Sequence, residues 1–578
     1  MSIINYRQPL KRFLELIALE KKEVKSIYFF AFVSGIIYLS LPLGIQAIIN
    51  FLLSGTISTS LILLTVMVVV GVFLNGWLQI MQMKINENIQ RRIFTRYSLQ
   101  FAYKIPRLDL TAIEDYYLPE LVNRFFDIAS LQKGISKILL ELPAASIQVF
   151  FGLLLLSFYH PIFIAFGIFL VALMIFTLHI TYKKGITTSL EESNYKYRVG
   201  YWLEEVARII KTIKFMGRTD FPVQKADKFV SGYLDARSEH FKVLKVQYWA
   251  FVFFKVTITA LLLIIGGWLV LKQQINIGQF IASEIIIITL LNSIEKIIGS
   301  LDVVYDMLTS LEKVSKILDK PTEKEDGIDI SEISNSKGIS IKAENLSFAY
   351  SDDDDRVLHH LNFEIKSGEK ICIFGTQGSG KSTLLKLFTG GFLNYSGNLL
   401  YNNYPLGNYN LQKLRSEIGV YLGTADLFSS TLYDNLTLGD TEITTNTILS
   451  TAEQTGLLPF IQSLSNGLET RIETLGRKLP ITTVNKILLT RAILTKPKLF
   501  LLEDFWSGLE AIEQEIFIKN LFSPNNEFTL IAVTNDVHFA RNCDRIILLE
   551  DGKILKNGSF AELNNSEEYK RMFKHLSL

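Results

Sequence analysis

A glycine-rich segment in the second half of the chain, GTQGSGKST at residues 375–383, has the spacing of a phosphate-binding loop. It follows the apolar run KICIF and opens the helix-forming run STLLKLF, which is the strand–loop–helix context that such a loop requires. Glycines let the backbone N–H groups wrap phosphates closely, Lys381 can reach the β- and γ-phosphates, and Ser382 can take a magnesium position. We therefore predict that a nucleoside triphosphate binds here. The predicted nucleotide-binding residues of the loop are Gly375, Thr376, Gln377, Gly378, Ser379, Gly380, Lys381, Ser382 and Thr383.

A second chemical signal is the run KPKLFLLEDFWSGLE, in which apolar residues lead into two adjacent carboxylates, Glu503 and Asp504. A strand that ends in acids can hold a magnesium ion and orient a water molecule in nucleotide-binding folds. The run raises the question of whether this site hydrolyses its nucleotide, binds it without hydrolysis, or does neither.

The elements that must position these residues fall into two halves of a 578-residue chain, which is too long for one domain. The first half contains six apolar spans, each of about 20 residues or more with few charges, enough to cross the bilayer as helices. We predict membrane helices rather than the core helices of a soluble protein. The spans are Ile27–Asn50, Leu61–Met83, Ile138–Phe158, Pro161–Ile180, Tyr248–Leu271 and Gly278–Ser300.

The connectors between the spans alternate in length and charge. Three are short and nearly uncharged, whereas the two beginning KINENIQRR and TYKKGITTS are long, rich in Lys and Arg, and helical in their periodicity. Positive residues stay in the cytoplasm, so both termini and the two long connectors are expected there. We expect the connectors to be continuations of the membrane helices. Residues 1–26 are expected to form an interfacial helix whose apolar face carries Phe13, Leu14, Leu16 and Ile17.

The second half has a different pattern. We predict a membrane domain at 27–312, a polar linker at 313–338 and a further domain at 339–578. In that last domain, short β-rich runs alternate with helical patterns, which indicates an α/β fold with a largely parallel sheet. The two cysteines, Cys372 and Cys543, lie in apolar runs and are predicted to be buried thiols without a disulfide. A net charge of +2 gives no bulk attraction to nucleic acid, so no nucleic-acid partner is expected.

Six spans with long helical extensions, followed by a domain with this phosphate loop, resemble a half-size ATP-binding cassette (ABC) transporter of the exporter type. The resemblance covers nearly the whole chain, and LPLGIQAIINFLLSG in the first span resembles secretion-type exporters, including the haemolysin-like group. It implies ATP and Mg²⁺ as ligands and assigns the adenine-stacking role to Tyr350 of the run FAY. It also implies short coupling helices near Glu114–Asn123 and Tyr197–Glu205.

The chain departs from the family pattern at its acidic strand. Family members usually place Asp before Glu, whereas here Glu503 takes the metal-side position and Asp504 the catalytic position. A one-residue slip of the strand is the alternative to this alignment, but it would turn every side chain to the opposite face of the sheet, so we reject it. Asp is shorter than Glu by about 1 Å, and such a displacement can slow catalysis ~100-fold. The resemblance therefore assigns Ser382 and Glu503 to the metal and Asp504 to a degenerate catalytic position.

Four further positions differ from the family pattern. The signature segment, usually LSGGQ, reads LPITT at residues 479–483, where Pro480 lacks an N–H group and the next residues add bulk. Asn535 replaces the histidine that contacts the γ-phosphate, with His538 a less favoured substitute. Gly423 stands where a glutamine near magnesium is expected, and Glu510 where an aspartate contacts the opposite chain. We predict ATP binding with weak or very slow hydrolysis at the site of this chain.

The resemblance also implies partners. Two such chains pair to form two composite sites, and we favour a heterodimer with a more active chain over a homodimer. The expected function is export of a peptide or protein, a lipid or a hydrophobic small molecule across the inner or plasma membrane, in contact with membrane lipid and with secretion adaptor proteins as further candidate partners. The alternative is a non-transport subunit that binds ATP as a regulator or scaffold of a secretion assembly. Polar residues in the spans could line a substrate path or join helices; they include Gln46, Asn75, Gln79, Gln148 and Asn292.

Overall fold

The computed structural model describes residues 7–53, 59–114, 116–333, 337–351, 355–423, 426–504, 509–524, 526–564 and 566–568. The chain forms two compact units. Unit 1 comprises Met1–Pro106 and Tyr116–Lys320, and unit 2 comprises Arg107–Asp115 and Pro321–Leu578.

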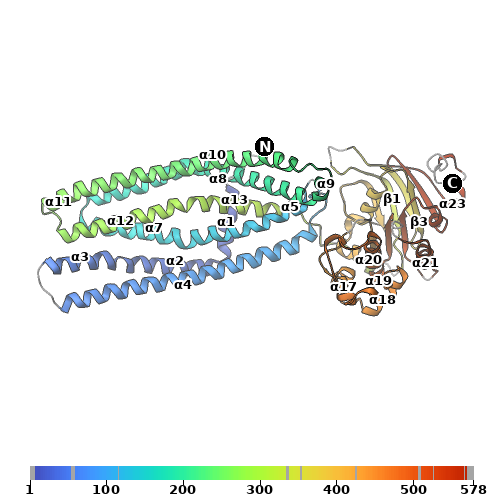
Figure 1. Ribbon diagram of the computed structural model, residues 1–578, viewed down its shortest axis with the longest axis horizontal. Coiled ribbons are helices and arrows are strands. Elements are labelled where there is room, and N and C mark those ends of the chain that lie inside the picture. The colour runs from blue at the N-terminus through green and yellow to red at the C-terminus, as the bar shows by residue number, and fades with distance from the viewer. Residues whose placement is uncertain are drawn as a thin grey trace. The chain divides into compact units, whose positions relative to one another are not determined.

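Unit 1 is a bundle of long helices (Figure 1). Among the described residues, six helical segments are long and apolar enough to cross a membrane, which confirms the six predicted spans. These segments are Lys21–Leu53, Thr59–Arg107, Leu118–Tyr159, Gly167–Arg208, Phe221–Leu271 and Ile277–Leu318. The helices of unit 1 are α1 (Arg7–Leu19), α2 (Lys21–Tyr38), α3 (Ser40–Leu53), α4 (Thr59–Lys104), α5 (Leu118–Asn123), α6 (Asp127–Ser136), α7 (Leu142–Tyr159), α8 (Ile162–Arg208), α9 (Ile210–Phe215), α10 (Phe221–Leu261), α11 (Gly267–Leu271), α12 (Ile277–Gly299) and α13 (Leu301–Leu318).

The charged connectors continue the apolar spans as helix, as predicted. Helix α4 has 46 residues and α8 has 47, and at 1.5 Å per residue each is about twice as long as the hydrocarbon core is thick. The short helix expected at Tyr197–Glu205 is instead part of α8, and the short helix at the turn before α10 is α9. The basic, aromatic composition of the connector gave no signal for the break at Ile209, where the backbone leaves helical geometry at ψ 20°.

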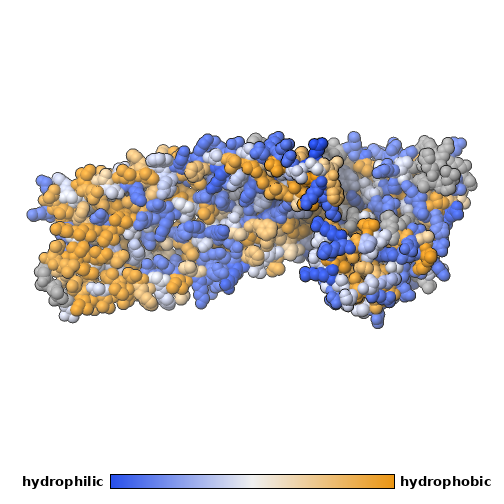
Figure 2. Space-filling model, in the orientation of Figure 1, coloured by the Kyte–Doolittle hydropathy of each residue, from blue (hydrophilic) through white to orange (hydrophobic). Residues whose placement is uncertain are grey.

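The surface of unit 1 is strongly apolar over the half that contains α3, α11 and the start of α4 (Figure 2). Large apolar side chains are more than half exposed there, among them Leu63 at 62%, Phe73 at 71% and Leu271 at 84%. A continuous apolar surface of this size is unfavourable in water and is typical of a lipid-facing region.

The N-terminal helix α1 packs on unit 1 itself. Phe13 and Leu16 are buried in a core that they share with residues of α4, α6 and α13. Arg12 forms ion pairs with Glu312, at 2.7 Å, and with Asp319. Leu14 remains 58% exposed, so the predicted apolar face is divided between the protein core and the outer surface.

Unit 2 is an α/β domain, as predicted, with a six-stranded sheet in the order β12-β11-β3-β10-β9-β6. Strands β11, β3, β10, β9 and β6 are parallel, β12 is antiparallel at one edge, and a second, antiparallel sheet has the order β2-β1-β4-β5. The strands are β1 (Ile341–Phe348), β2 (Leu358–Ile365), β3 (Lys370–Gly375), β4 (Ser396–Tyr401), β5 (Tyr404–Pro405), β6 (Ile418–Tyr421), β7 (Ser430–Thr431), β8 (Arg471–Ile472), β9 (Leu499–Glu503), β10 (Thr529–Val533), β11 (Arg545–Glu550) and β12 (Lys553–Gly558). The helices are α14 (Ile330–Ile333), α15 (Lys381–Phe388), α16 (Leu411–Ser416), α17 (Leu432–Thr437), α18 (Thr445–Gln454), α19 (Leu458–Ser463), α20 (Ile481–Leu494), α21 (Ala511–Leu521), α22 (Val537–Ala540) and α23 (Phe560–Asn564).

The central strand β3 shows why this sheet is buried on both faces. Ile371 and Ile373 belong to the core that contains α15, whereas Cys372 and Phe374 belong to the core that contains α20. Side chains alternate between faces along a strand, so an uninterrupted apolar run supplies both cores. Both cysteines are buried free thiols, as predicted.

The segment Arg107–Asp115 lies between two parts of unit 1 in sequence but belongs to unit 2. Leu108 forms an isolated antiparallel bridge with Thr322, and the Glu323 N–H donates to the Arg107 carbonyl at 2.9 Å. Helix α13 continues to Leu318, beyond the predicted start of the linker at Lys313, because Lys313, Val314 and Ile317 are all buried in unit 1. The polar composition of this stretch had suggested an exposed linker.

Candidate nucleotide-binding site

The predicted phosphate loop lies between β3 and α15, in the required strand–loop–helix arrangement. Gly375 is buried, and a Cβ placed on it would lie 2.3 Å from the Leu549 carbonyl oxygen. Gly380 precedes α15 with φ +93°, and a Cβ there would lie 2.6 Å from Leu358 Cδ2. A larger residue at Gly375 would therefore displace the end of β11, and one at Gly380 would overlap the Leu358 side chain. Thr376, Gln377 and Gly378 form its exposed crest, and Ser379 is buried below it.

The Lys381 side chain folds back onto the phosphate loop. Its ammonium donates to the carbonyl of Gly375 at 2.9 Å and to that of Thr376 at 2.7 Å. Burial lowers the pKa of Lys381, and the carboxylates of Asp504 and Glu503 oppose this shift. An ammonium group on a long side chain beside backbone N–H groups suits the binding of a polyphosphate.

The two residues assigned to the metal are in contact. The Ser382 hydroxyl donates a hydrogen bond to the Glu503 carboxylate at the end of β9. Burial raises the pKa of Glu503, reinforced by the nearby Asp504 and opposed by the hydrogen bond from Ser382. No cluster of three or more His, Cys, Asp or Glu side chains suited to a metal occurs in the described part of the chain. Mg²⁺ needs no such cluster, because it is usually held by one or two protein oxygens together with water and substrate phosphates. The pair of hard oxygen ligands fits this ion.

Asp504 and Asn535 lie beside the loop at the ends of the neighbouring parallel strands. Asp504 is exposed, has a left-handed backbone at φ +42°, and its N–H donates to the Val533 carbonyl at 3.0 Å. Asn535 follows β10, and its side-chain oxygen accepts from the Gly375 N–H at 3.4 Å. The parallel pairing of β10 with β9 places Val533 opposite Glu503.

Tyr350 is held against the phosphate-loop helix. Its hydroxyl forms a 3.0 Å hydrogen bond with the Thr383 hydroxyl, and its ring lies edge-on to Phe348 at 5.1 Å and to Phe392 at 5.4 Å. Phe392 is a lone aromatic after α15, and no motif in the sequence marks it. These contacts fix the orientation of the Tyr350 ring.

The signature segment is apart from these residues in sequence and opens α20. Pro480 is the residue before the helix, with ψ 143°, and has no N–H to offer. Ile481 is 62% exposed at the first helical position. Gly423, after β6, has φ +69°, which favours glycine over the glutamine expected there. Glu510 caps α21 and pairs reciprocally with Glu513 in a capping box.

Comparison with known proteins identifies both halves of the chain. The model of the ABC transporter transmembrane region matches residues 26–294, and that of the ABC transporter domain matches residues 358–505. The chain belongs to the ABC transporters of the exporter type. It is accordingly an integral membrane protein, and the matched ABC transporter domain implies ATP binding.

This ABC exporter is similar to proteins named for toxin translocation. It is 26% identical over 368 residues to the alpha-hemolysin translocation ATP-binding protein HlyB of Escherichia coli, covering 64% of this chain and 52% of the relative. It is 27% identical over 363 residues to the toxin RTX-I translocation ATP-binding protein of Actinobacillus pleuropneumoniae, covering 63% and 51%. The chain thus spans about half the length of these curated relatives.

The fold of this ABC exporter is also found among solved structures. A bacterial Atm1-family ABC exporter with ATP bound superposes with a TM-score of 0.83 over 97% of this chain and 99% of that chain. The sequence identity is 15%, so the likeness concerns the fold alone.

Proposed function

We propose that this chain is an ATP-binding half of an ABC exporter that moves a substrate out across the inner or plasma membrane, with slow ATP hydrolysis at its own site. The observation that carries the proposal is the presence of six membrane-length helices and a complete phosphate loop in one chain. The positive connectors support cytoplasmic termini and a cytoplasmic ATP-binding domain.

The proposed binding reaction uses residues already close together. Lys381 and the loop N–H groups would hold the phosphates of ATP, Tyr350 would support its adenine, and Ser382 and Glu503 would hold Mg²⁺. Bound Mg²⁺ would offset the negative charge of the phosphates. The hydrogen bond between the Thr383 and Tyr350 hydroxyls would keep the Tyr350 ring beside the phosphate loop.

Slow hydrolysis is proposed from the two side chains at the strand ends. The carboxylate of Asp504 is one methylene shorter than that of the usual glutamate, so a water molecule held by it lies farther from the γ-phosphate. Asn535 can donate or accept a hydrogen bond but cannot carry a proton or a positive charge at that point. Each change leaves nucleotide binding intact while weakening the step in which water attacks.

A dimer is needed to complete each site, and we propose a heterodimer with a more active ABC chain. The LPITT segment would face the partner's ATP, where Pro480 lacks one N–H and Ile481 is bulky and exposed. A partner with an intact signature would supply the contacts that a second copy of this chain would lack. The names of the relatives, which refer to toxin translocation, support a peptide or protein substrate. The apolar spans are also suited to a lipid or a hydrophobic small molecule.

The test is ATP turnover by the purified chain in lipid nanodiscs, with Lys381→Ala as the blank and Asp504→Glu as the gain-of-function variant. We expect the wild type to bind a fluorescent ATP analogue while its phosphate release stays near the blank, and Asp504→Glu to raise release by about tenfold or more. Wild-type turnover far above Lys381→Ala would refute the slow-hydrolysis proposal.

Export is tested separately, by adding the candidate partner chain and following substrate in inside-out vesicles. ATP-dependent accumulation that requires both chains would support the heterodimer. Nucleotide binding with no substrate movement for any partner would favour the regulator or scaffold function instead.

A further inference from the structure

Two helices of unit 1 carry almost all the charged side chains of the predicted membrane spans. Lys255 lies on α10, Glu284, Glu295 and Lys296 lie on α12, and Glu141 precedes α7. A charged side chain in contact with lipid tails is costly, so such residues usually face the interior of a helix bundle or a water-filled cavity. The surroundings of the charges on α10 and α12 therefore indicate what lies beside these two helices.

Helix α10 has two exposed stripes of different chemistry. The polar stripe contains Tyr248 and Lys255, which lie two helical turns apart and whose side chains are 46% and 47% exposed. The other stripe is apolar and is suited to contact with lipid. Its members follow one another at helical spacing and are exposed at 64–66%: Trp249, Phe253 and Val256.

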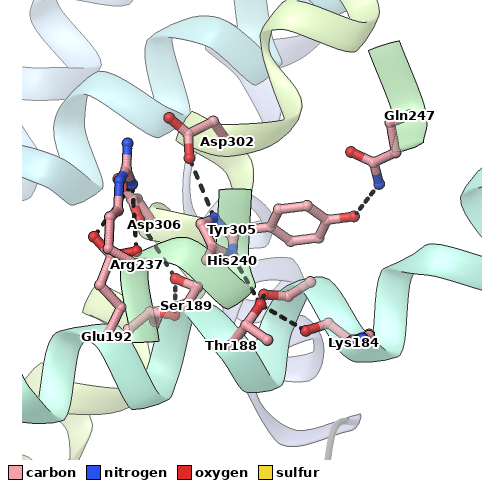
Figure 3. Close-up of polar contacts among 12 residues, drawn as sticks. Lys184, Thr188, Ser189, Glu192, Arg237, His240, Gln247, Asp302, Tyr305 and Asp306 are labelled. Atoms are coloured by element: carbon pink, nitrogen blue, oxygen red, sulfur yellow. Dashed lines mark hydrogen bonds and ion pairs between the residues drawn. The ribbon is translucent and has the colours of Figure 1, made fainter. Parts of the chain in front are cut away.

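The remaining face of α10 is buried in unit 1. Gln247, next to Tyr248 in sequence, is buried, and its amide nitrogen donates to the Tyr305 hydroxyl at 2.9 Å. Figure 3 shows this side chain directed from α10 at Tyr305 of α13. Consecutive residues of a helix differ by about 100° around its axis, so Tyr248 cannot share this core. The polar stripe therefore lies between the buried face and the apolar stripe of α10.

The two polar residues of α10 meet at Glu295 of α12. The Tyr248 hydroxyl donates to one carboxylate oxygen of Glu295 at 3.1 Å, and the Lys255 ammonium lies 3.6 Å from the other. This ion pair is loose, because the Lys255 ammonium makes no hydrogen bond with the described residues and the Glu295 side chain is 40% exposed. A carboxylate has about four acceptor positions and an ammonium three donors. Both groups therefore keep most of their hydrogen-bonding capacity for a further partner.

Asn292 extends this polar face along α12. It lies one turn from Glu295 on the same side of the helix, it is exposed, and its carboxamide makes no hydrogen bond with the described residues. Helix α12 is attached to α10 through Glu295 and to α2 through a 3.4 Å hydrogen bond between Thr289 and Tyr38. The exposed part of α12 therefore offers a carboxylate and a neutral amide side by side, next to the ammonium of Lys255.

The ion pair lies deeper than the lipid headgroups. Lys255 is seven residues from Tyr248 and Glu295 is five residues from Ser300, the inner ends of the two predicted spans, which corresponds to roughly 10 Å and 7 Å along a helix. Headgroups lie outside the hydrocarbon core. A lysine has a long stem that can reach toward them, but a glutamate has not. The open side of Glu295 therefore requires water or a polar ligand.

We propose that this polar face lines an aqueous part of the export path and binds a segment of polypeptide in which a basic and an acidic side chain are neighbours. The proposal rests on the export function proposed above and narrows its substrate. Lys255 binds the acidic group, Glu295 binds the basic group, and Asn292 forms hydrogen bonds with a neighbouring peptide bond.

Charge complementarity favours this ligand over the other substrate classes. A dipolar ligand replaces one loose ion pair by two and leaves neither Lys255 nor Glu295 without a counter-charge. A neutral lipid or a hydrophobic small molecule would displace water from both groups and offer them no partner. A zwitterionic lipid headgroup has the right charges but lies nearer the membrane surface than this pair.

The first measurement asks whether water reaches this face. Asn292→Cys in the full chain, in nanodiscs without nucleotide, is treated with a sulfonated maleimide that does not enter lipid, and the labelled residues are located by mass spectrometry. Val256→Cys is the matched control, because it lies on the apolar stripe of α10 and, like Asn292, eight residues from the inner end of its span. We expect labelling at position 292 to be faster by about tenfold or more, since hydrocarbon excludes both the reagent and the reactive thiolate. Equal labelling rates at the two positions would overturn the proposal.

The second measurement tests the ligand. Labelling of Asn292→Cys is repeated with millimolar Gly-Lys-Glu-Gly, blocked at both ends, and with the uncharged peptide Gly-Gln-Gln-Gly. We expect the Lys-Glu peptide to slow labelling about threefold and the uncharged peptide to have no effect. Adding Lys255→Met or Glu295→Gln should remove this protection, whereas Lys296→Met, which removes a lysine outside the pair, should keep it.

The outcomes separate this proposal from the export function. Neither measurement uses ATP turnover or transport, so a failure of export alone would leave both results unchanged. Rapid labelling without protection by the Lys-Glu peptide would overturn the ligand assignment and leave the export function standing. Equal protection by the two peptides, or protection that survives both Lys255→Met and Glu295→Gln, would also overturn it, because the ion pair would then not recognise the peptide charges. Labelling of position 292 in each variant shows that the protein is folded.

Discussion

The side-chain oxygen of Asn535 accepts a hydrogen bond from the backbone N–H of Gly375 at 3.4 Å, which joins the end of β10 to the first residue of the phosphate loop. The side chain at position 535 is therefore beside the phosphate loop, where a group that can carry a proton would influence hydrolysis. We expect Asn535→His to raise ATP turnover by about tenfold when introduced into Asp504→Glu, because an imidazole can carry a proton where an amide cannot.

Phosphate release in nanodiscs measures this effect. Asn535→Ala in the same background is the matched control, since it removes the contact with Gly375 without adding a titratable group. Equal rates in the histidine and alanine variants would show that position 535 does not influence the reaction.

Two glycines of the phosphate loop have similar backbone angles but different surroundings. Gly380 has φ +93°, and a Cβ added to it would lie 2.6 Å from Leu358 Cδ2. Gly378 has φ +81°, and a Cβ added to it would have no other atom within 4 Å. Both alanine variants bear the left-handed backbone penalty of about 1–2 kcal/mol, and only Gly380→Ala adds a steric overlap. We expect unit 2 to unfold at a lower temperature in Gly380→Ala than in Gly378→Ala. Differential scanning fluorimetry without nucleotide measures both temperatures. Equal melting of the two variants would contradict this account of the loop.

The contact between Ser382 and Glu503 predicts that removing the Glu503 carboxylate weakens the effect of Mg²⁺ on nucleotide affinity. In the wild type, Mg²⁺ should tighten the binding of a fluorescent ATP analogue relative to EDTA. Glu503→Gln should remove roughly tenfold of that advantage and leave the affinity in EDTA unchanged, because an amide oxygen is a weaker ligand than a carboxylate. Titrations of the analogue in both buffers give the comparison.

Glu510→Gln is the control for this titration. Glu510 is also an acid in unit 2, but its side chain caps α21. It should retain the full magnesium effect. A magnesium effect of wild-type size in Glu503→Gln would remove Glu503 from the predicted metal site.

Local patterns in the sequence were sufficient for some features and not for others. The phosphate loop and the six spans depend on residues close together in the chain, so spacing and hydropathy predicted them. The assignment of Arg107–Asp115 to unit 2 depends on pairing with residues near Pro321, which no local pattern encodes. The support of Tyr350 by Phe392 arises in the same way, from side chains distant in sequence.

The polar residues of the spans illustrate the same limit. Composition left open whether they line a path or join helices. The structure pairs Gln46 with Tyr159, Asn75 with Ser34, and Gln148 with Ser293. These pairs join α3 to α7, α2 to α4, and α7 to α12, which favours helix packing for these three. Gln79 and Asn292 are exposed on unit 1 and stay candidates for a path.

A buried carboxylate at the junction of α1 and α2 leads to the last prediction. Glu20 is 3% exposed and accepts hydrogen bonds from Arg92 and Arg96, each at 3.0 Å. Glu20→Ala would leave the Arg96 guanidinium without its anion in a partly buried position, at a cost of about 3 kcal/mol. We expect a fall of about 5 °C in the thermal unfolding midpoint of the detergent-solubilised chain. Glu23→Ala is the matched control, because Glu23 also pairs with Arg92, at 2.7 Å, but is more exposed, and its loss should lower the midpoint less. A midpoint for Glu20→Ala equal to that of Glu23→Ala would show that the buried pair does not hold α2 against α4.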